Sequence, residues 1–436
     1  MTTEKNNLTV IILAAGVGSR MKSSIPKAMH ILGGVPMIDH LLEKAEALNP
    51  SQIISVIGED MPELHNYIIT KSDVAHQTKR LGSAHAVYTT KYAHDLKSGV
   101  TLVLYADTPL VSKGSLVELA NKVMSGDCEV CVLGFEKEEE NSYGKLVIDG
   151  DILLSIVEHK DATDEEKEIL LCNSGVMAIK TEIIWDLLES VNNENSQQEY
   201  YLTDIIKIAN DNKYRCSYVI DLEDNLHGAN SKLELADLER SFQQSQRLKF
   251  LQSGVQLVDP DTVFFSIDTR IGKDVVIHPN VHILPKSEIH NGAVIYPFST
   301  IEGAIVGENC KVGPYARLRP QTVLMGENNI GNFVEIKKST IGRGTKVNHL
   351  SYIGDTKIGQ KTNIGAGTIT CNYDGKNKFN TVIGDNSFIG SNTALVAPVS
   401  VGNNSMIGAG STITKSIGNN SLGLSRAVQK VFPRKG

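Results

Sequence analysis

The 436-residue sequence predicts an α/β domain followed by a parallel β-helix, and two patterns support this. Before Gly254, short aliphatic runs such as Val10–Leu13 and Ile53–Ile57 alternate with helix-like stretches such as Met37–Leu48, as expected for a sheet with crossover helices. From Gly254 onward, an aliphatic residue recurs every six residues. Glycine usage changes at the same point, since 14 of the 37 Gly precede Gly254 and 23 lie from it onward.

A helix is predicted between the two architectures. Ser231 and Glu234 have the spacing of a capping box, and Gly254 suits the residue that follows the last helical turn. The sequence between them is polar and periodic, which favours a connecting helix over Ser231–Ser253. The expected division of the chain is 1–230 for the α/β domain, 231–254 for the linker helix and 255–436 for the β-helix domain.

The six-residue repeat fits one flat face of a three-sided coil of short parallel strands. Its aliphatic positions run from Ile271 to Ile407, and twenty-two of them at three per coil predict about seven coils. The segment Thr370–Val382 breaks the repeat, which then returns in register. We therefore expect this segment to leave the coil as a loop, and a polar loop on a rigid scaffold is a candidate for function.

Composition excludes several classes of protein. The formal net charge is −7, so bulk positive charge does not attract nucleic acid or anionic lipid. The longest early apolar run, Val10–Ala15, is far too short for a signal-peptide core or a membrane span, and the six Cys are scattered. We expect a cytoplasmic globular protein with small-molecule substrates, without nucleic-acid binding or membrane insertion.

The first strand is followed by a segment suited to phosphates, LAAGVGSRMKSSIPK. Gly16 and Gly18 allow backbone N–H groups to converge on an anion, and Arg20 and Lys27 supply fixed positive charge for phosphoryl transfer. The segment has neither a Walker A sequence nor the third glycine of a dinucleotide fingerprint. Taken alone, it fits a tight turn with solvated lysines equally well.

The full spacing, LAAGxGxRM with Pro26-Lys27, resembles the sugar-nucleotide pyrophosphorylases, which join a nucleoside triphosphate to a sugar 1-phosphate. Further segments match in order: Leu81-Gly-Ser-Ala-His85, Tyr105-Ala-Asp107, Glu158-His-Lys-Asp161 and Glu199-Tyr-Tyr-Leu-Thr203. The resemblance implies UTP as substrate, catalytic roles for Lys27 and Arg20, and Mg²⁺ held by Asp107 and Asn230. The implied nucleotide and sugar contacts are Leu13, Ala14, Ala15, Gly16, Lys27, Gln77, Gly82, Ser83, Tyr105, Asp107, Gly144, Glu158, Asn173, Tyr201, Thr203 and Asn230.

The repeat half carries a second set of motifs just before and within the loop: Arg317-Leu-Arg319-Pro, Gly331-Asn-Phe-Val-Glu-Ile-Lys337, His349-Leu-Ser-Tyr352, Asn363-Ile-Gly-Ala366 and Cys371-Asn-Tyr373-Asp-Gly. They resemble hexapeptide acyltransferases, whose coil is left-handed. Nearly the whole chain is similar to the bacterial family that joins N-acetylglucosamine-1-phosphate uridyltransferase to glucosamine-1-phosphate acetyltransferase.

This resemblance assigns roles in the second half. His349 is implied as the base that takes a proton from the sugar amine, with Glu335 orienting it. The implied sugar-phosphate contacts are Arg319, Lys337, Tyr352, Asn363, Tyr373 and Lys378. The implied acetyl-CoA contacts are Ala366, Asn372, Tyr373, Ser391, Ala409 and Arg426.

The resemblance predicts a bifunctional enzyme that acetylates glucosamine 1-phosphate with acetyl-CoA and then forms UDP-N-acetylglucosamine and pyrophosphate from UTP, acting as a homotrimer. One alternative is a pyrophosphorylase whose β-helix only assembles subunits, and the presence of His349 and Lys337 argues against it. Another is a nonenzymatic regulatory subunit, which the retained Lys27, Asp107 and Asn230 oppose.

Overall fold

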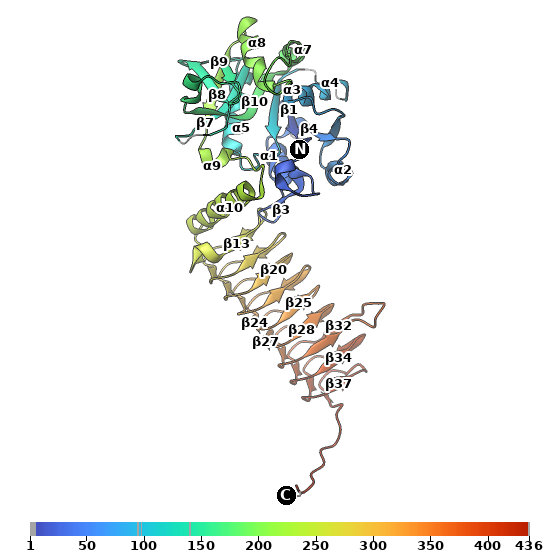
Figure 1. Cartoon of the computed structure of the whole chain (residues 1–436). Helices are drawn as coiled ribbons and strands as arrows, with labels where there is room; N and C mark the ends of the chain where they lie inside the picture. Colours follow the sequence, from blue (N-terminus) through green and yellow to red (C-terminus); the bar gives the residue numbers. More distant parts are fainter. Residues whose placement is uncertain (1–5, 94–95, 97, 139–140, 435–436) are drawn as a thin grey trace. The chain divides into compact units, whose positions relative to one another are not determined.

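The computed structural model describes residues 6–93, 96, 98–138 and 141–434. Contacts divide the chain into two compact units, Met1–Phe242 and Gln243–Gly436, and the division lies inside the long helix α10, Lys232–Gln252 (Figure 1). The predicted capping box is present at its start, because Glu234 N donates to Ser231 Oγ and Ser231 N donates to Glu234 Oε2. None of the helices in the described ranges combines the length and apolar character needed to cross a membrane.

The first unit is built on a mixed sheet whose strand order is β11-β7-β10-β6-β1-β4-β5. In addition, β8 pairs with β10, and β9 pairs with β8. Its core strands β1, β4 and β6 are parallel and their apolar residues are buried on both faces, which explains their continuous aliphatic sequences. The strands are β1 Asn6–Leu13, β4 Pro50–Gly58, β5 Asp73–Gln77, β6 Val100–Tyr105, β7 Val130–Glu136, β8 Lys145–Asp149, β9 Ile152–Val157, β10 Leu171–Lys180 and β11 Cys216–Ile220, with β2 Ile31–Leu32 and β3 Val35–Pro36 forming a small separate pair.

Helices connect many of these strands along the chain, as the alternating sequence pattern predicts. In α5, for example, Ser112 caps the first turn by accepting a hydrogen bond from Ser115 N. The helices of this unit are α1 Met37–Glu46, α2 Pro62–Ile68, α3 Ser83–Tyr88, α4 Thr90–Ala93, α5 Lys113–Met124, α6 Asp164–Lys167, α7 Ile184–Glu189, α8 Ile205–Asp211 and α9 Glu223–Leu226.

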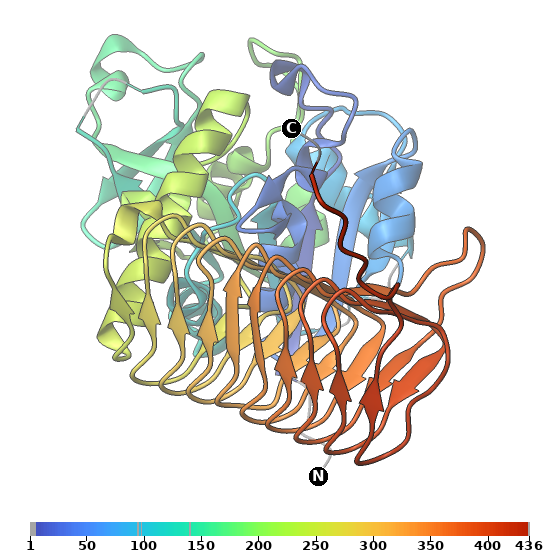
Figure 2. The same ribbon diagram turned by 90° about the horizontal axis from the view of Figure 1, so that it is seen from below.

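The second unit is a coil of short parallel strands arranged on three faces, consistent with the left-handed β-helix expected from the repeat (Figure 2). The first face holds β12 Gln256–Leu257, β15 Val276–Ile277, β18 Val294–Ile295, β21 Lys311–Val312, β24 Asn329–Asn332, β27 Lys346–His349, β30 Asn363–Ile364, β33 Phe388–Ile389, β36 Met406–Ile407 and β38 Leu422–Gly423. The second holds β13 Phe264–Phe265, β16 His282–Ile283, β19 Thr300–Ile301, β22 Arg317–Leu318, β25 Glu335–Lys337, β28 Tyr352–Gly354, β31 Ile369–Cys371, β34 Ala394–Val396 and β37 Thr412–Ile413. The third holds β14 Arg270–Ile271, β17 Glu288–Ile289, β20 Ala304–Val306, β23 Thr322–Leu324, β26 Thr340–Ile341, β29 Thr356–Ile358, β32 Thr381–Ile383 and β35 Val399–Val401.

The aliphatic residues of the repeat form the core of this coil, as predicted, since Ile295, Ile336 and Ile389 are fully buried. The coil is longer than the repeat indicated. It begins at β12, before the first aliphatic position at Ile271, and ends at β38. The first coil was missed for two reasons: Phe265 lies six residues before Ile271 but is aromatic, not aliphatic, and Leu257 lies eight residues before Phe265, which breaks the six-residue spacing.

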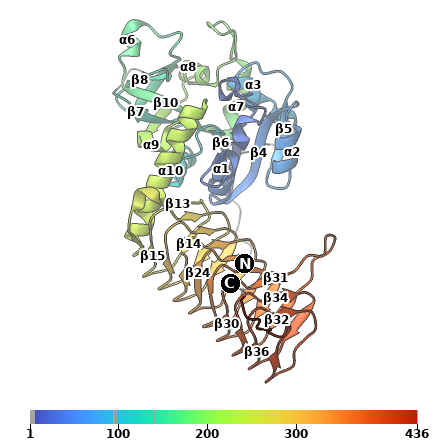
Figure 3. The same cartoon turned by 60° about the horizontal axis from the view of Figure 1, so that its bottom comes forward.

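The break in the repeat leaves the coil as a loop between β31 and β32, as predicted (Figure 3). The loop is internally bonded: Tyr373 and Lys378 form an antiparallel bridge, and Asp374 Oδ1 accepts hydrogen bonds from Lys376 N and Asn377 N. These two backbone donors lower the pKa of Asp374. The loop is therefore a defined hairpin.

A buried histidine makes the first unit sensitive to acid. His40 on α1 donates from Nε2 to Leu32 O at 2.8 Å and packs edge-on against Phe242. Burial lowers its pKa from 6.5 to about 4. The neutral form is thus the folded form, so its stabilising contribution is complete above pH 6.5 and is lost as the pH falls toward 4.

We expect His40 to reduce the free energy of unfolding by about 2 kcal/mol between pH 7 and pH 5. The measurement is urea unfolding at both pH values, followed by fluorescence of Trp185, which is the single Trp and lies in this unit. His40→Gln keeps a donor near Leu32 and should show a smaller decrease. An equal decrease in the variant would contradict the assignment.

Candidate active sites

The segment Leu13–Lys27, which the sequence predicts to bind phosphate, contributes to the wall of a cavity of about 330 Å³ at the carboxyl ends of β1 and β6. Its walls include ten of the predicted nucleotide contacts, together with Glu199, from the predicted segment Glu199–Thr203, and Arg80, which was not predicted from the sequence. Arg80 donates from Nε to Ala15 O at 2.7 Å and also pairs with Asp60. The predicted residues on the wall are Leu13, Ala14, Ala15, Gly16, Lys27, Gln77, Gly82, Ser83, Tyr105 and Asp107.

Hydrogen bonds hold the matched segment Leu81–His85 against the segment that contains Tyr200. Tyr200 N donates to Leu81 O, Ala84 N donates to Tyr200 O, and Leu202 N donates to Ser83 Oγ. Gly82 has φ +121, and a Cβ there would lie 2.4 Å from Tyr200 O, so only glycine fits between the two segments. Gln77 donates from Nε2 to Gly82 O and completes the turn.

Lys27 brings together the two residues expected to bind metal. Its Nζ lies 2.5 Å from Asp107 Oδ2 and 2.6 Å from Asn230 Oδ1. The backbone also joins these segments, since Ala229 N donates to Asp107 O at 2.9 Å. A carboxylate and an amide oxygen directed at one cation are the donors that Mg²⁺ prefers, so the residues fit this ion.

The predicted sugar contacts Glu158, Tyr201 and Thr203 line a second cavity of about 720 Å³. Thr203 donates from Oγ1 to Glu158 Oε1 at 3.0 Å. Burial, followed by the charges of Asp204 and Asp161, raises the pKa of Glu158. A carboxylate held by a hydroxyl in such a cavity can accept hydrogen bonds from sugar hydroxyl groups.

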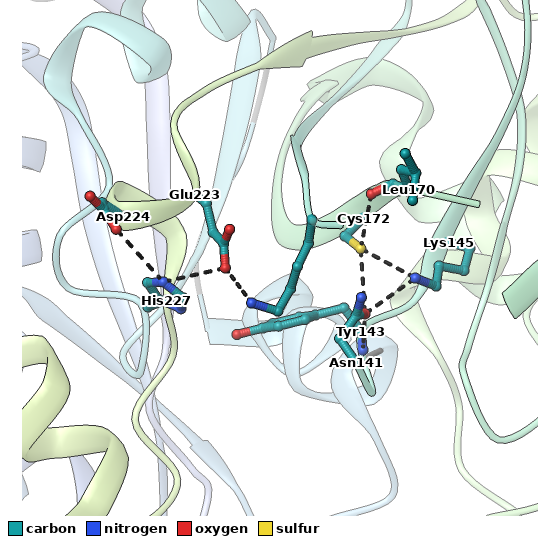
Figure 4. Close-up of polar contacts among 9 residues, drawn as sticks. Asn141, Tyr143, Lys145, Leu170, Cys172, Glu223, Asp224 and His227 are labelled. Atoms are coloured by element: carbon teal, nitrogen blue, oxygen red, sulfur yellow. Dashed lines mark hydrogen bonds and ion pairs between the residues drawn. The ribbon is translucent and has the colours of Figure 1, made fainter. Parts of the chain in front are cut away.

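Gly144 and Asn173 are adjacent, because Asn173 N donates to Gly144 O at 2.8 Å. The next pair along the strands is Lys145 and Cys172, both buried, and Lys145 Nζ contacts Asn141 Oδ1 and Cys172 Sγ at 3.2 and 3.5 Å (Figure 4). Burial raises the pKa of the Cys172 thiol. These contacts hold the two strand ends that carry Gly144 and Asn173.

An ion pair between Lys137 and Glu223 joins the same region to α9, and His227 Nε2 lies 3.5 Å from Glu223 Oε1 (Figure 4). The chain after α9 leads to Asn230, so this pair helps to position that residue. Arg20 lies in a short 3₁₀ turn, Ser19–Met21, and is exposed. It does not line the nucleotide cavity, so its catalytic role stays a prediction.

In the second unit, strand stacking aligns His349 with Asn332 on the preceding coil. His349 Nδ1 lies 2.9 Å from Asn332 Oδ1. With this oxygen as acceptor, Nδ1 carries the proton and Nε2 is left with a lone pair. Asn332, and not the expected Glu335, is the side chain in hydrogen-bond contact with His349; Glu335 accepts a hydrogen bond from Arg319 at 2.7 Å.

The sequence pattern did not single out Asn332, since six-residue spacing shows which residues point inward and not which outward residues meet. The residues that follow the pair lie in corners of a kind that recurs along the coil, as at Phe298 and Tyr315. Phe333 and Leu350, the residues that follow Asn332 and His349, have φ of 56° and 48°, in the left-handed region that such side chains rarely adopt. Both strands therefore end in the same turn, and the two polar side chains lie side by side.

Three cations gather on the neighbouring face. Arg319 and Lys337 occupy equivalent positions on successive coils, and Lys378 comes from the loop. Lys378 lowers the pKa of Lys337, first through a side-chain hydrogen bond and then through its positive charge. The charge of Arg319 acts in the same direction. Arg319 is paired with Glu335, so the repulsion that an anion would relieve is mainly between Lys337 and Lys378, and this relief is what the predicted sugar-phosphate contact requires.

Tyr352 and Asn372 meet above Gly354. A Cβ on Gly354 would lie 2.5 Å from the Tyr352 hydroxyl and 2.7 Å from Asn372 Nδ2, so the glycine leaves room for both. Asn372 is fixed by donating to the buried Asp355 at 2.6 Å. Asn363 lies on the first face, one coil beyond the strand that carries His349, and Tyr373 in the loop is exposed.

Four of the six predicted acetyl-CoA residues, Ala366, Ser391, Ala409 and Arg426, form a column along one corner of the coil, whereas Asn372 and Tyr373 lie in the loop after β31. Gly367 N donates to His349 O, Gly410 N donates to Ser391 O, and Arg426 Nη1 donates to Ala409 O at 2.8 Å. Ala366 belongs to the same column, because its carbonyl accepts from Asn392 N. The column starts at His349 and ends at Arg426.

Comparisons with known proteins match both halves. A family described as MobA-like NTP transferase domain matches residues 10–192, and the bacterial transferase hexapeptide family (six repeats) matches residues 268–303 and 380–415. The chain is therefore a nucleotidyltransferase domain joined to a hexapeptide-repeat transferase coil, and the predicted fold class is confirmed.

Relatives extend over nearly the whole chain. "Bifunctional protein GlmU" of Paramagnetospirillum magneticum is 46% identical over 97% of this chain and 94% of its own length. "Bifunctional protein GlmU" of Bartonella quintana is 44% identical over 96% of this chain and 94% of its own length. Among solved structures, apo UDP-glucose pyrophosphorylase is 17% identical, with a TM-score of 0.45 over 55% of this chain and 98% of that chain.

This chain belongs to the bifunctional GlmU family. Membership confirms the prediction of a bifunctional enzyme with a uridyltransferase and an acetyltransferase half, acting on a nucleotide and acetyl-CoA. It argues against a β-helix that only assembles subunits and against a nonenzymatic subunit.

The Asn332–His349 contact predicts a selective defect. Asn332→Leu should lower the acetyl-transfer kcat by about tenfold or more, because a general base that is poorly oriented loses part of its usual contribution. It should also change the pH profile of the acetyl-transfer kcat. The uridyltransferase rate should be unchanged. Asn332→Asp still accepts from Nδ1 and should retain much more activity. Equal activity of the Leu and Asp variants would contradict an orienting role.

Proposed function

We propose that the first unit transfers UMP from UTP to N-acetylglucosamine 1-phosphate and releases pyrophosphate. The supporting observation is the cavity in which Gly16, Lys27 and Asp107 meet. Backbone N–H groups of the glycine segment and the Lys27 ammonium bind the triphosphate, while Glu158 and Thr203 hold the sugar. Mg²⁺ on Asp107 and Asn230 would neutralise phosphate charge and align the attacking oxygen.

The second unit, in our proposal, acetylates glucosamine 1-phosphate. Arg319, Lys337 and Lys378 bind the phosphate, which places the sugar amine near His349. Nε2 of His349 removes a proton from the amine as nitrogen attacks the thioester carbon. The resulting tetrahedral adduct collapses with cleavage of the C–S bond, and the protonated imidazole can return the proton to the departing thiolate.

The corner column suits an extended pantetheine arm. Successive coils are separated by about 4.8 Å, so the three steps from His349 to Ala409 cover roughly 14 Å. Ala366, Ser391 and Ala409 present small side chains along this path, and Arg426 stands at its end to meet a phosphate of CoA.

The two sites predict separable activities. His349→Ala should lower acetyl transfer by about 10²–10⁴-fold and leave uridyl transfer intact. Asp107→Ala should do the reverse, because it removes the carboxylate of the metal site. The assay is pyrophosphate release with Mg²⁺ and UTP from N-acetylglucosamine 1-phosphate or glucosamine 1-phosphate, each with and without acetyl-CoA.

His290→Ala and Asp127→Ala serve as matched controls, since both residues are exposed and lie outside the two sites. Release from the unacetylated sugar only in the presence of acetyl-CoA would support both reactions in the wild type. Loss of both activities in either folded site variant would overturn the two-site assignment.

We also propose that the enzyme is a homotrimer in which a neighbouring coil closes the acetyl site. His349 and Tyr373 are exposed in the single chain, so one copy does not enclose the thioester. An exposed aromatic row, Phe298, Tyr315 and Phe333, stacks along the edge that leads to Leu350 and offers apolar surface for contact.

Light scattering on the full-length protein as it elutes from a size-exclusion column should give a mass about three times the 47.4 kDa of one chain. Phe333→Glu places a charge in the aromatic row and should shift the protein toward monomer with loss of acetyl transfer. A wild-type protein that is monomeric at assay concentration and fully active would contradict the trimer.

A further inference from the structure

The Lys27 ammonium occupies the position that the metal ion would take between Asp107 and Asn230. Its Nζ is the shared partner of Asp107 Oδ2 at 2.5 Å and Asn230 Oδ1 at 2.6 Å, and the Lys27 and Asp107 side chains are only 14% and 24% exposed. These oxygens are the atoms assigned above to the metal. An ammonium and a divalent ion cannot both take this position.

Charge balance favours the ammonium while no nucleotide is bound. Lys27 neutralises Asp107, and a divalent ion arriving alone would place two positive charges beside a third. A triphosphate changes this balance, because its oxygens can accept both the metal and the ammonium. The divalent ion can then replace the Lys27 ammonium at Asp107, and the ammonium can pair with the triphosphate, so that no charge is left unpaired.

The geometry allows this exchange. Asp107 and Asn230 are held by their backbones, since Ala229 N donates to Asp107 O and Asn230 N donates to Glu234 Oε2. Lys27 is attached through four flexible methylene groups and lines the same cavity as Gly16. Apart from the two chain neighbours of Gly16, no heavy atom of the described residues lies within 4 Å of the position of a Cβ on Gly16. The oxygens can stay in place while the ammonium moves toward bound phosphate.

We propose that Lys27 is a built-in counter-cation that excludes free divalent metal from Asp107 and Asn230, so that the metal enters together with the nucleoside triphosphate. This inference rests on the metal site assigned under the proposed function. It adds a second role for Lys27: it keeps the two ligands in position between turnovers and is released to the phosphates when the metal arrives.

The test measures binding of Mn²⁺ alone to the full-length protein by electron paramagnetic resonance of the free ion. Mn²⁺ prefers the same oxygen ligands as Mg²⁺. Lys27→Met should bind Mn²⁺ at least about tenfold more tightly than wild type, since it removes the competing charge. Lys22→Met removes a charge of the same type from the same segment without contact to Asp107 and should match wild type.

Lys27→Gln gives a second variant should the Met substitution impair folding, which circular dichroism would reveal. With UTP present, wild type and Lys27→Met should differ less in Mn²⁺ affinity. Equal affinity of wild type and both Lys27 variants without nucleotide would overturn the inference.

Asp107→Asn separates this inference from the metal site itself. It should abolish Mn²⁺ binding both alone and in the Lys27→Met background. If it abolishes binding while Lys27→Met has no effect, the metal site stands and the counter-cation role fails. If it leaves Mn²⁺ binding to Lys27→Met unchanged, the metal assignment itself fails.

Discussion

Both sites depend on parallel strands that pair in register. In the first unit Leu13 pairs with Tyr105, so the segments after β1 and β6 emerge at one edge of the sheet and bring Gly16 close to Asp107. In the coil, pairing of Asn332 with His349 sets the imidazole. In the coil, a one-residue shift would turn one of these two side chains to the opposite face, because strand side chains alternate.

The two sites handle positive charge differently. In the first, Lys27 is neutralised by Asp107 and held by Asn230, so the site is balanced within the chain. In the second, Lys337 and Lys378 repel each other, and this repulsion lowers the pKa of Lys337. A balanced site suits a substrate that brings its own cation, whereas a repulsive one suits a bare phosphate monoester.

Corner residues with left-handed backbone recur along the coil, from Asp274 to Asn420. Most left-handed corners can be occupied by asparagine at little cost, as at Asn280 and Asn309, but Phe333 and Leu350 adopt the same region next to the polar pair. Their exposed apolar side chains are better explained by the proposed contact with a neighbouring coil than by stability of the single chain.

Much of the fold was accessible from sequence because its signals are local and repeated. The six-residue period identifies inward positions such as Ile295 and Ile389, and the break at Thr370–Val382 identifies the loop. The first coil was hidden because Phe265, six residues before Ile271, is aromatic and Leu257 lies eight residues before Phe265. Ordered motifs likewise located the nucleotide residues, ten of which share one cavity.

Contacts between distant segments could be decided only by tertiary structure. The sequence by itself determined which residue types the sites contain, because glycines, lysines and carboxylates stand at readable spacings. It could not show that Asn332 rather than Glu335 contacts His349, or that Lys27 lies between Asp107 and Asn230. Those pairings depend on strand register and on how segments 80 and 203 residues apart approach each other, and neither is a property of local sequence.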